Sequence, residues 1–229
     1  MPIYFYTDNY LQKEYLSNVY TTPFGYKYFM FASLDNGSDT LRLCLASEPD
    51  KLDPALNSTV DGACLAINTF AGLMTYNEEG QQVNDLAEDV QMSEDGLTYT
   101  VTLKDDLKWS NGDPLDANDF VYSWNRAANP MTASDYGYMF APIKGYAEMT
   151  EMDDDGNLVN TDATLDVTAS EDGKTLTINL EYPCAYFKDL LAFPTYFPVH
   201  QASVEAADPD ARTGAGRLRP ASFPTALTR

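Results

Sequence analysis

The sequence predicts an α/β or α+β domain spanning about residues 41 to 198. Two observations lead to this class. Apolar and polar residues alternate, as in half-buried strands, over 41–45, 98–103 and 175–180. Between the last two segments, residues 117–128 have the capping and apolar stripe of a helix. With 229 residues, 44% of them apolar, the chain is long enough to bury a core.

The first 76 residues predict short elements. Residues 1–33 are dense in Tyr and Phe, a composition typical of short strands with aromatic packing. The polar residues 33–40 indicate a linker or long turn. Leu41–Leu45 alternates and predicts a half-buried strand. In residues 61–76, apolar side chains recur three or four positions apart, which predicts a helix.

Two later segments share one pattern. Residues 93–103 and 170–180 each begin Ser-Glu-Asp-Gly and continue into strict alternation. An Asp-Gly turn before an alternating run predicts the returning strand of a hairpin. The side chains expected to face the core are Tyr99, Val101 and Leu103 in the first copy and Leu176, Ile178 and Leu180 in the second.

The helix between the two hairpins has a defined start and end. Asp116 can cap it, Asp119 lies in its first turn, and Asn129-Pro130 ends it. Phe120, Val121 and Trp124 form the apolar stripe. Before it, the sequence Trp109-Ser-Asn-Gly-Asp-Pro114 predicts a turn that lets the Trp109 indole pack over the helix, so we expect Trp109, Trp124 and Arg126 to be structural.

Composition excludes several functions. A formal charge of −21 repels phosphate backbones and anionic lipid surfaces, so we expect no nucleic-acid partner. No apolar run is long enough for a membrane helix, and residues 1–5 do not resemble an export signal. The single histidine, His200, is expected in a loop and leaves little material for a His-based metal site or a Ser/His/Asp triad. Cys44, Cys64 and Cys184 match no metal or redox spacing and are expected to be free thiols.

The segment from Leu86-Ala-Glu88 through Pro130 carries a family resemblance. Its long ordered run, Ser-Glu-Asp-Gly-Leu-Thr-Tyr-Thr-Val-Thr-Leu-Lys-Asp-Asp-Leu-Lys-Trp-Ser-Asn-Gly-Asp-Pro-Leu-Asp-Ala-Asn-Asp-Phe-Val-Tyr-Ser-Trp-Asn-Arg, resembles the signature of the peptide and nickel family (family 5) of ABC-transporter solute-binding proteins. Residues 47–54 and 69–73 resemble that family's first strand and first helix, and 183–200 resembles the end of its small lobe. The run from Asn129 to Tyr136 best fits the oligopeptide-binding branch.

The resemblance implies a type II periplasmic-binding-protein-like fold. Residues 41–70 would begin the main lobe and 71–198 would form the small lobe. It also implies an extracytoplasmic monomer that is not an enzyme, needs no cofactor or metal, and does not insert into the membrane. Its partners would be an oligopeptide ligand and ABC-transporter permease subunits. The family's chains are more than twice this length, with a large C-terminal lobe that closes over the peptide.

The two ends of the sequence depart from the family order. Residues 1–34 resemble the family's C-terminal end, here placed first and followed by a linker at 35–40, as in a permuted or gene-fused chain. Residues 199–229 are expected to be irregular. From Ala211 the composition changes to Arg, Pro, Gly and Ala, which we interpret as a frameshifted or disordered tail.

The resemblance also implies a ligand-binding surface. Backbone groups of Ser58, Thr59, Val60 and Asp61 and the ring and hydroxyl of Tyr136 would face the peptide.

Residues 151–162 approximate a calcium-binding loop, but their end residues do not fit, and a solvated hairpin loop is favoured. The alternatives are an inactive fragment, or a glycosidase, for which acidic residues are abundant but occur in no recognisable pair.

Overall fold

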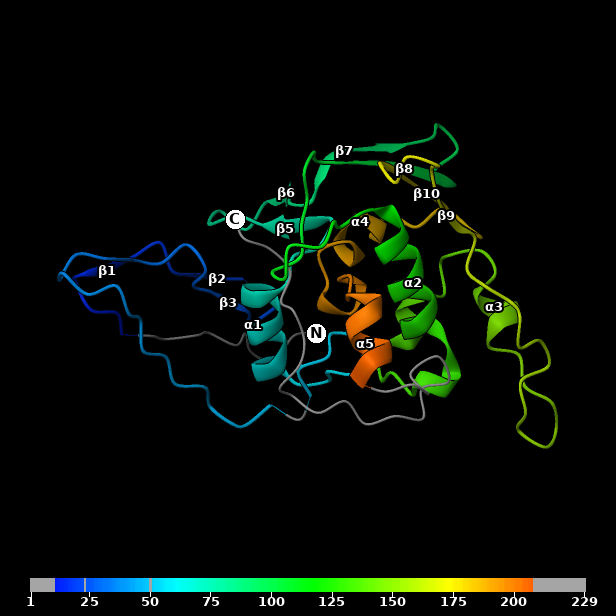
Figure 1. The fold of residues 1–229 in the computed structure, drawn as a ribbon, viewed down its shortest axis with the longest axis horizontal. Helices are drawn as coiled ribbons and strands as arrows, with labels where there is room; N and C mark the ends of the chain where they lie inside the picture. The colour runs from blue at the N-terminus through cyan, green and yellow to red at the C-terminus, as the bar shows by residue number, and fades with distance from the viewer. Residues whose placement is uncertain (1–10, 23, 50, 208–229) are drawn as a thin grey trace, which may run out of the picture.

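The computed structural model describes residues 11–22, 24–49 and 51–207. In Figure 1 a sheet lies along one side of the helices, and the N-terminal strands extend away from it toward the left. The family-like motif at residues 2–6 and the arginine-containing segment 211–229 lie outside the described residues. Among the residues placed by the structure, no helix is long and apolar enough to cross a membrane.

The central sheet is antiparallel and has four strands in the order β7-β8-β10-β9. They are β7 (Ala87–Met92), β8 (Thr98–Leu103), β9 (Val167–Ala169) and β10 (Thr175–Asn179). The two predicted returning strands, β8 and β10, pair with each other, with Leu176 opposite Val101 and Ile178 opposite Tyr99. Their core-facing residues are buried, as predicted. The shared pattern of the two hairpins therefore builds the middle of one sheet.

The two hairpin turns have the same chemistry. Ser93 Oγ donates to Asp95 at 2.6 Å, and Ser170 Oγ donates to Asp172 at 2.6 Å. Gly96 and Gly173 follow at φ of 71° and 70°, a conformation that glycine adopts without strain. Both Asp-Gly turns are confirmed.

The predicted helix is α2 (Ala117–Ala128), and it has the predicted cap. Asp116 accepts from the N–H of Asn118 at 2.7 Å, and the Asp119 carboxylate accepts from the N–H of Asp116 at 3.0 Å, forming a capping box. Trp109 is buried against this helix start, with its Nε1 3.4 Å from Asp119 Oδ2. The structural assignment of Trp109 and Trp124 is confirmed.

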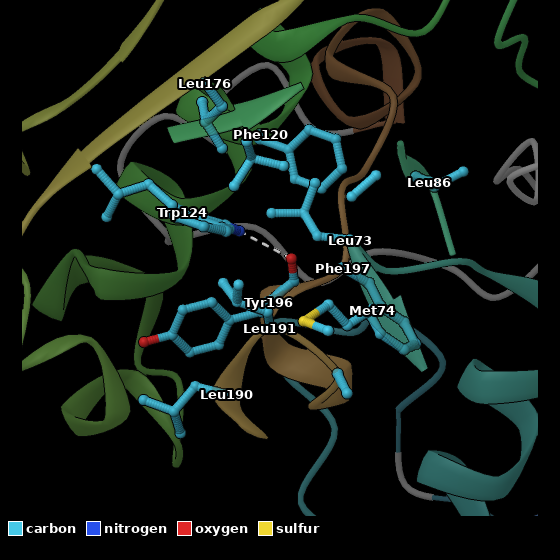
Figure 2. Packing of buried hydrophobic residues seen from close by; sticks show 14 of the residues in the cluster. Leu73, Met74, Leu86, Phe120, Trp124, Leu176, Leu190, Leu191, Tyr196 and Phe197 are labelled. Atoms are coloured by element: carbon cyan, nitrogen blue, oxygen red, sulfur yellow. Dashed lines mark hydrogen bonds between the residues drawn. The ribbon is translucent and has the colours of Figure 1, made fainter. Parts of the chain in front are cut away.

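Trp124 lies at the centre of the core. Its Nε1 donates to the carbonyl of Tyr196 at 2.8 Å, the dashed line in Figure 2. Around it pack Phe120, Phe140 and the ring of Tyr196. The chain that supplies Tyr196 runs through α4 (Phe187–Leu190), the 3-10 turn η3 (Pro194–Tyr196) and α5 (Gln201–Ala207). The expectation of irregular structure from residue 199 onward is therefore wrong over α5. His200 precedes α5 in a loop, as predicted.

The predicted helix over 61–76 is wrong in its second half. Helix α1 spans Val60–Thr69, and β5 (Met74–Tyr76) follows and pairs with β6 (Gln82–Asn84). Gly72 lies where a Cβ would collide with the Phe197 ring, and its carbonyl accepts from the N–H of Leu86 at 3.0 Å. These tertiary contacts outweigh the apolar spacing.

The predicted strand Leu41–Leu45 is also wrong. The segment has no regular structure, and three of its five residues are exposed. An isolated strand gains nothing from alternation unless a neighbour supplies the ladder of backbone hydrogen bonds. No strand among the described residues pairs with this one.

The N-terminal segment forms two small strand pairs. β1 (Leu16–Ser17) pairs with β4 (Ser33–Leu34), and β2 (Tyr20–Thr21) pairs with β3 (Lys27–Tyr28). The rings of Tyr20 and Tyr28 stack at 4.8 Å. Short strands with aromatic packing are thus confirmed in the described part, and the last of them, β4, includes the first two residues of the polar stretch 33–40.

The remaining elements are short. They are the 3-10 turns η1 (Pro130–Thr132) and η2 (Gly137–Phe140) and the helix α3 (Tyr146–Met149). The loop considered for calcium is a hairpin, because Met152 and Leu158 form a bridge and Asp153 accepts from the N–H of Asn157 at 2.8 Å. The favoured hairpin interpretation holds.

Candidate functional site

Three of the five predicted ligand-binding residues line one small cavity. Thr59 and Val60 come from the start of α1, and Tyr136 comes from the loop before η2. The cavity has a volume of about 30 Å³, and its other lining residues are Tyr26, Asn57, Ala63, Phe193, Pro194 and Thr195. The structure therefore brings together residues that lie more than 70 positions apart in the chain. Ser58 and Asp61 are not among the lining residues.

The start of α1 is held by a local network. Thr59 caps the helix by accepting from the N–H of Gly62 at 3.2 Å, and the buried Asn57 donates its Nδ2 to the Thr59 carbonyl at 3.0 Å. A Cβ at Gly62 would collide with Asn57 Oδ1. The glycine allows the asparagine to lie against the helix, and this contact fixes the cavity edge formed by Thr59.

Asp61 is engaged away from the cavity. Its Oδ2 accepts from the N–H of Ser47 at 2.9 Å and from the Ser47 hydroxyl at 2.6 Å. These hydrogen bonds lower the pKa of the Asp61 carboxyl, and the bond from the Ser47 hydroxyl contributes most. The carboxylate thus ties the preceding loop to the first turn of α1. This contact gives the Asp61 side chain a structural task, and the expectation that the Asp61 backbone faces the ligand stays a prediction.

Tyr136 and Phe193 form the aromatic side of the cavity. Their rings meet edge to face, with centroids 5.3 Å apart. Core contacts fix both segments. The Tyr196 hydroxyl donates to the Met139 carbonyl at 2.8 Å and so ties η3 to η2. Trp124 holds the Tyr196 carbonyl from the other side (Figure 2). The wall is therefore anchored to the core.

The side chains that line the cavity carry no charge. Its lining residues offer the hydroxyls of threonine and tyrosine and one amide, and none of them has a carboxylate, imidazole, thiol or amine side chain. Such groups can donate and accept hydrogen bonds but form no general acid–base pair. His200 lies elsewhere, 3.1 Å from Asp113 and over the Trp109 ring. The residues that line the cavity thus offer hydrogen-bonding groups without an acid–base pair among them.

A buried ion pair outside the cavity lining was not predicted. Arg126 of α2 contacts Asp53 through both terminal nitrogens, at 2.6 and 3.2 Å, and both side chains are almost fully buried. Asp53 also accepts from the N–H of Ala55 at 3.0 Å. The pair joins the loop before α1 to helix α2. The only sequence signal for this ion pair is the place of Arg126 on a helix whose other face is apolar. The sequence around Asp53 gives no indication of the pair.

A wider groove lies outside this site. Its volume is about 780 Å³, and it runs along β5, β6 and the loop at 104–108. None of the predicted ligand-binding residues lines it. Its rim carries charges of both signs, including Glu78, Glu79 and Lys108.

Fold and site together define a class: a mixed sheet-and-helix lobe with a neutral, hydroxyl-lined recess, as in a ligand-binding protein. The chain belongs to the bacterial extracellular solute-binding proteins, family 5, whose middle-region profile matches residues 81–219. That family consists of binding proteins rather than enzymes. The match continues eight residues past Ala211, where the composition changes.

Related proteins extend the comparison. The chain is 41% identical over 143 residues to the dipeptide-binding protein of Lactococcus lactis subsp. cremoris, covering 62% of this chain and 24% of the relative. It is 39% identical over 172 residues to the oligopeptide-binding protein OppA of Bacillus subtilis, covering 74% and 30%. The structure of Listeria monocytogenes OppA bound to peptide matches with a TM-score of 0.67 at 32% identity, covering 76% and 33%. The chain thus spans a quarter to a third of the length of these relatives.

Proposed function

We propose that this chain is part of an extracytoplasmic oligopeptide-binding component of an ABC importer. The supporting observation is that Thr59, Val60 and Tyr136, assigned to the ligand from family resemblance, line one cavity with aromatic and hydroxyl walls. Relatives named for dipeptide and oligopeptide binding support the ligand class. Permease subunits of the importer are the proposed protein partner, and the proposed binding unit is a monomer.

In this proposal the small lobe, residues 71–198, and the start of the main lobe, residues 41–70, provide one wall of the peptide site. The buried pair of Asp53 and Arg126 connects these two parts. Backbone groups at Ser58 to Asp61 hydrogen-bond the peptide main chain, and Tyr136 adds a ring and a hydroxyl. Main-chain recognition of this kind tolerates many side chains.

The test is to map binding on the full chain by NMR. Amide resonances are followed while trialanine is added to millimolar concentration, with a disaccharide as the control ligand. The proposal expects shifts confined to the cavity residues, including Thr59 and Tyr136, and none with the disaccharide. Equal shifts with both compounds, or shifts only in the groove near Tyr76 and Lys108, would contradict it.

A further inference from the structure

One cavity wall comes from the N-terminal segment. Tyr26 lies just before β3 and lines the cavity with Thr59 and Tyr136. Asn68 of α1 holds this segment: its Nδ2 donates to the Lys27 carbonyl at 2.9 Å, and its Oδ1 accepts from the N–H of Phe29 at 2.8 Å. One side chain thus bonds to Lys27 in β3 and to Phe29 just after it, and it positions the neighbouring Tyr26 beside α1.

The Tyr26 hydroxyl is available to a ligand. Three buried tyrosines use their hydroxyls within the protein: those of Tyr20, Tyr76 and Tyr196 each donate to a protein oxygen at 2.8 to 2.9 Å. Within residues 11–22, 24–49 and 51–207, the hydroxyls of Tyr26 and Tyr136 have no such partner. Both of these tyrosines line the cavity.

The hydroxyl is also in the right state to donate. Burial, followed by the neighbouring Tyr136 and Cys64, raises the pKa of Tyr26 to about 12. The phenol therefore keeps its proton throughout the neutral range and offers one O–H donor.

The size and polarity of the cavity restrict what this donor can meet. A space of about 30 Å³ has room for one or two water molecules, or for a single carbonyl group, but not for a large side chain. Its lining has no charged group that would attract an ion. A main-chain carbonyl of a peptide has the size and the acceptor character that fit.

We propose that Tyr26 is a further ligand-binding residue, which donates a hydrogen bond to a peptide carbonyl, directly or through one water, opposite Tyr136. The inference rests on the proposed peptide-binding function and adds a recognition group from a segment that family resemblance had not assigned to the site. The N-terminal segment then takes part in ligand recognition as well as in packing.

The test compares Tyr26→Phe with Tyr15→Phe in the full chain. Both variants remove one hydroxyl from the same segment, but Tyr15 is exposed and lies outside the cavity. Trialanine affinity is measured by NMR titration. Tyr26→Phe should weaken binding about fivefold, which corresponds to one hydrogen bond, at an unchanged melting temperature, and Tyr15→Phe should have no effect.

A second measurement does not depend on folding of the variant. In wild-type protein with ¹³C-labelled tyrosine, peptide should shift the ring resonance of Tyr26. Unchanged affinity in Tyr26→Phe, together with an unmoved Tyr26 resonance, would overturn the inference about Tyr26. If Tyr136→Phe lost binding in the same experiments, the proposed peptide-binding function would still stand. Absence of any peptide-induced shift at Thr59 and Tyr136 in the wild type would overturn both.

Discussion

Removing the negative charge of the buried ion pair should destabilise the fold strongly. In Asp53→Asn the guanidinium of Arg126 stays buried but loses its counterion. Among the described residues its only hydrogen-bond partner is Asp53, since Nε has none. Leaving one partner of a buried pair uncompensated costs about 3–5 kcal/mol. The guanidinium can donate to the single amide oxygen of the asparagine, but this contact cannot replace the bidentate contact with the carboxylate.

Urea denaturation of the wild type and of Asp53→Asn gives the difference in their free energies of unfolding, from the midpoint and slope of each transition. Lys144→Gln is the matched control. It breaks the pair of Lys144 and Asp166, which are 3.7 Å apart with the lysine side chain 62% exposed, so the change should stay below about 1 kcal/mol. If Asp53→Asn cost no more than the control, the pair would not be buried, and the proposed link between 41–70 and the small lobe would fail.

Three further changes test other parts of the structure. Trp109→Ala should lower stability by about 3–5 kcal/mol in thermal melts, because the ring is buried, and a change below about 0.5 kcal/mol would show that it is exposed. Gly62→Ala should destabilise by about 1–3 kcal/mol, despite alanine's higher helix propensity, because its Cβ meets Asn57; a stabilised variant in urea titrations would disprove that contact. Burial raises the pKa of Asp119 to about 6, above its ordinary 3.8. The neutral acid therefore favours the folded state below pH 4, and this contribution, about 3 kcal/mol at most, is lost as pH rises to 6. The stability of wild type relative to Asp119→Asn should fall across that window, and a pH-independent difference would contradict the raised pKa.

Elements defined by local chemistry could be predicted from sequence. The turns at Gly96 and Gly173 need only the Ser and Asp beside them, and α2 needs only Asp116 and Asp119 to start. These signals lie within a few residues of the structure they specify. Segments whose structure depends on distant partners were predicted wrongly. Leu41–Leu45 alternates but meets no neighbouring strand in the described part of the chain, and the 61–76 pattern is interrupted at Gly72 by Phe197.

The candidate site shows the same division. Thr59, Val60 and Tyr136 came from family resemblance, and the structure places them around one cavity. Tyr26 could not be assigned in this way, because its position depends on Asn68, about forty residues later in the chain. The Asp61 backbone stays predicted to face the ligand, whereas nothing near Asp61 in sequence indicates the contact of its side chain with Ser47.

The most direct test of the central claim is the affinity of this chain for a short peptide. The one wall described here offers a few hydrogen bonds worth about 1 kcal/mol each, against about 4–15 kcal/mol for the lost freedom of association. We therefore expect trialanine to bind the wild type no more tightly than about 1 mM by NMR titration. Tyr136→Ala should abolish the shifts, whereas Tyr138→Ala, which removes a neighbouring exposed tyrosine outside the cavity, should leave them unchanged. A micromolar site, or equal loss in the two variants, would contradict the account.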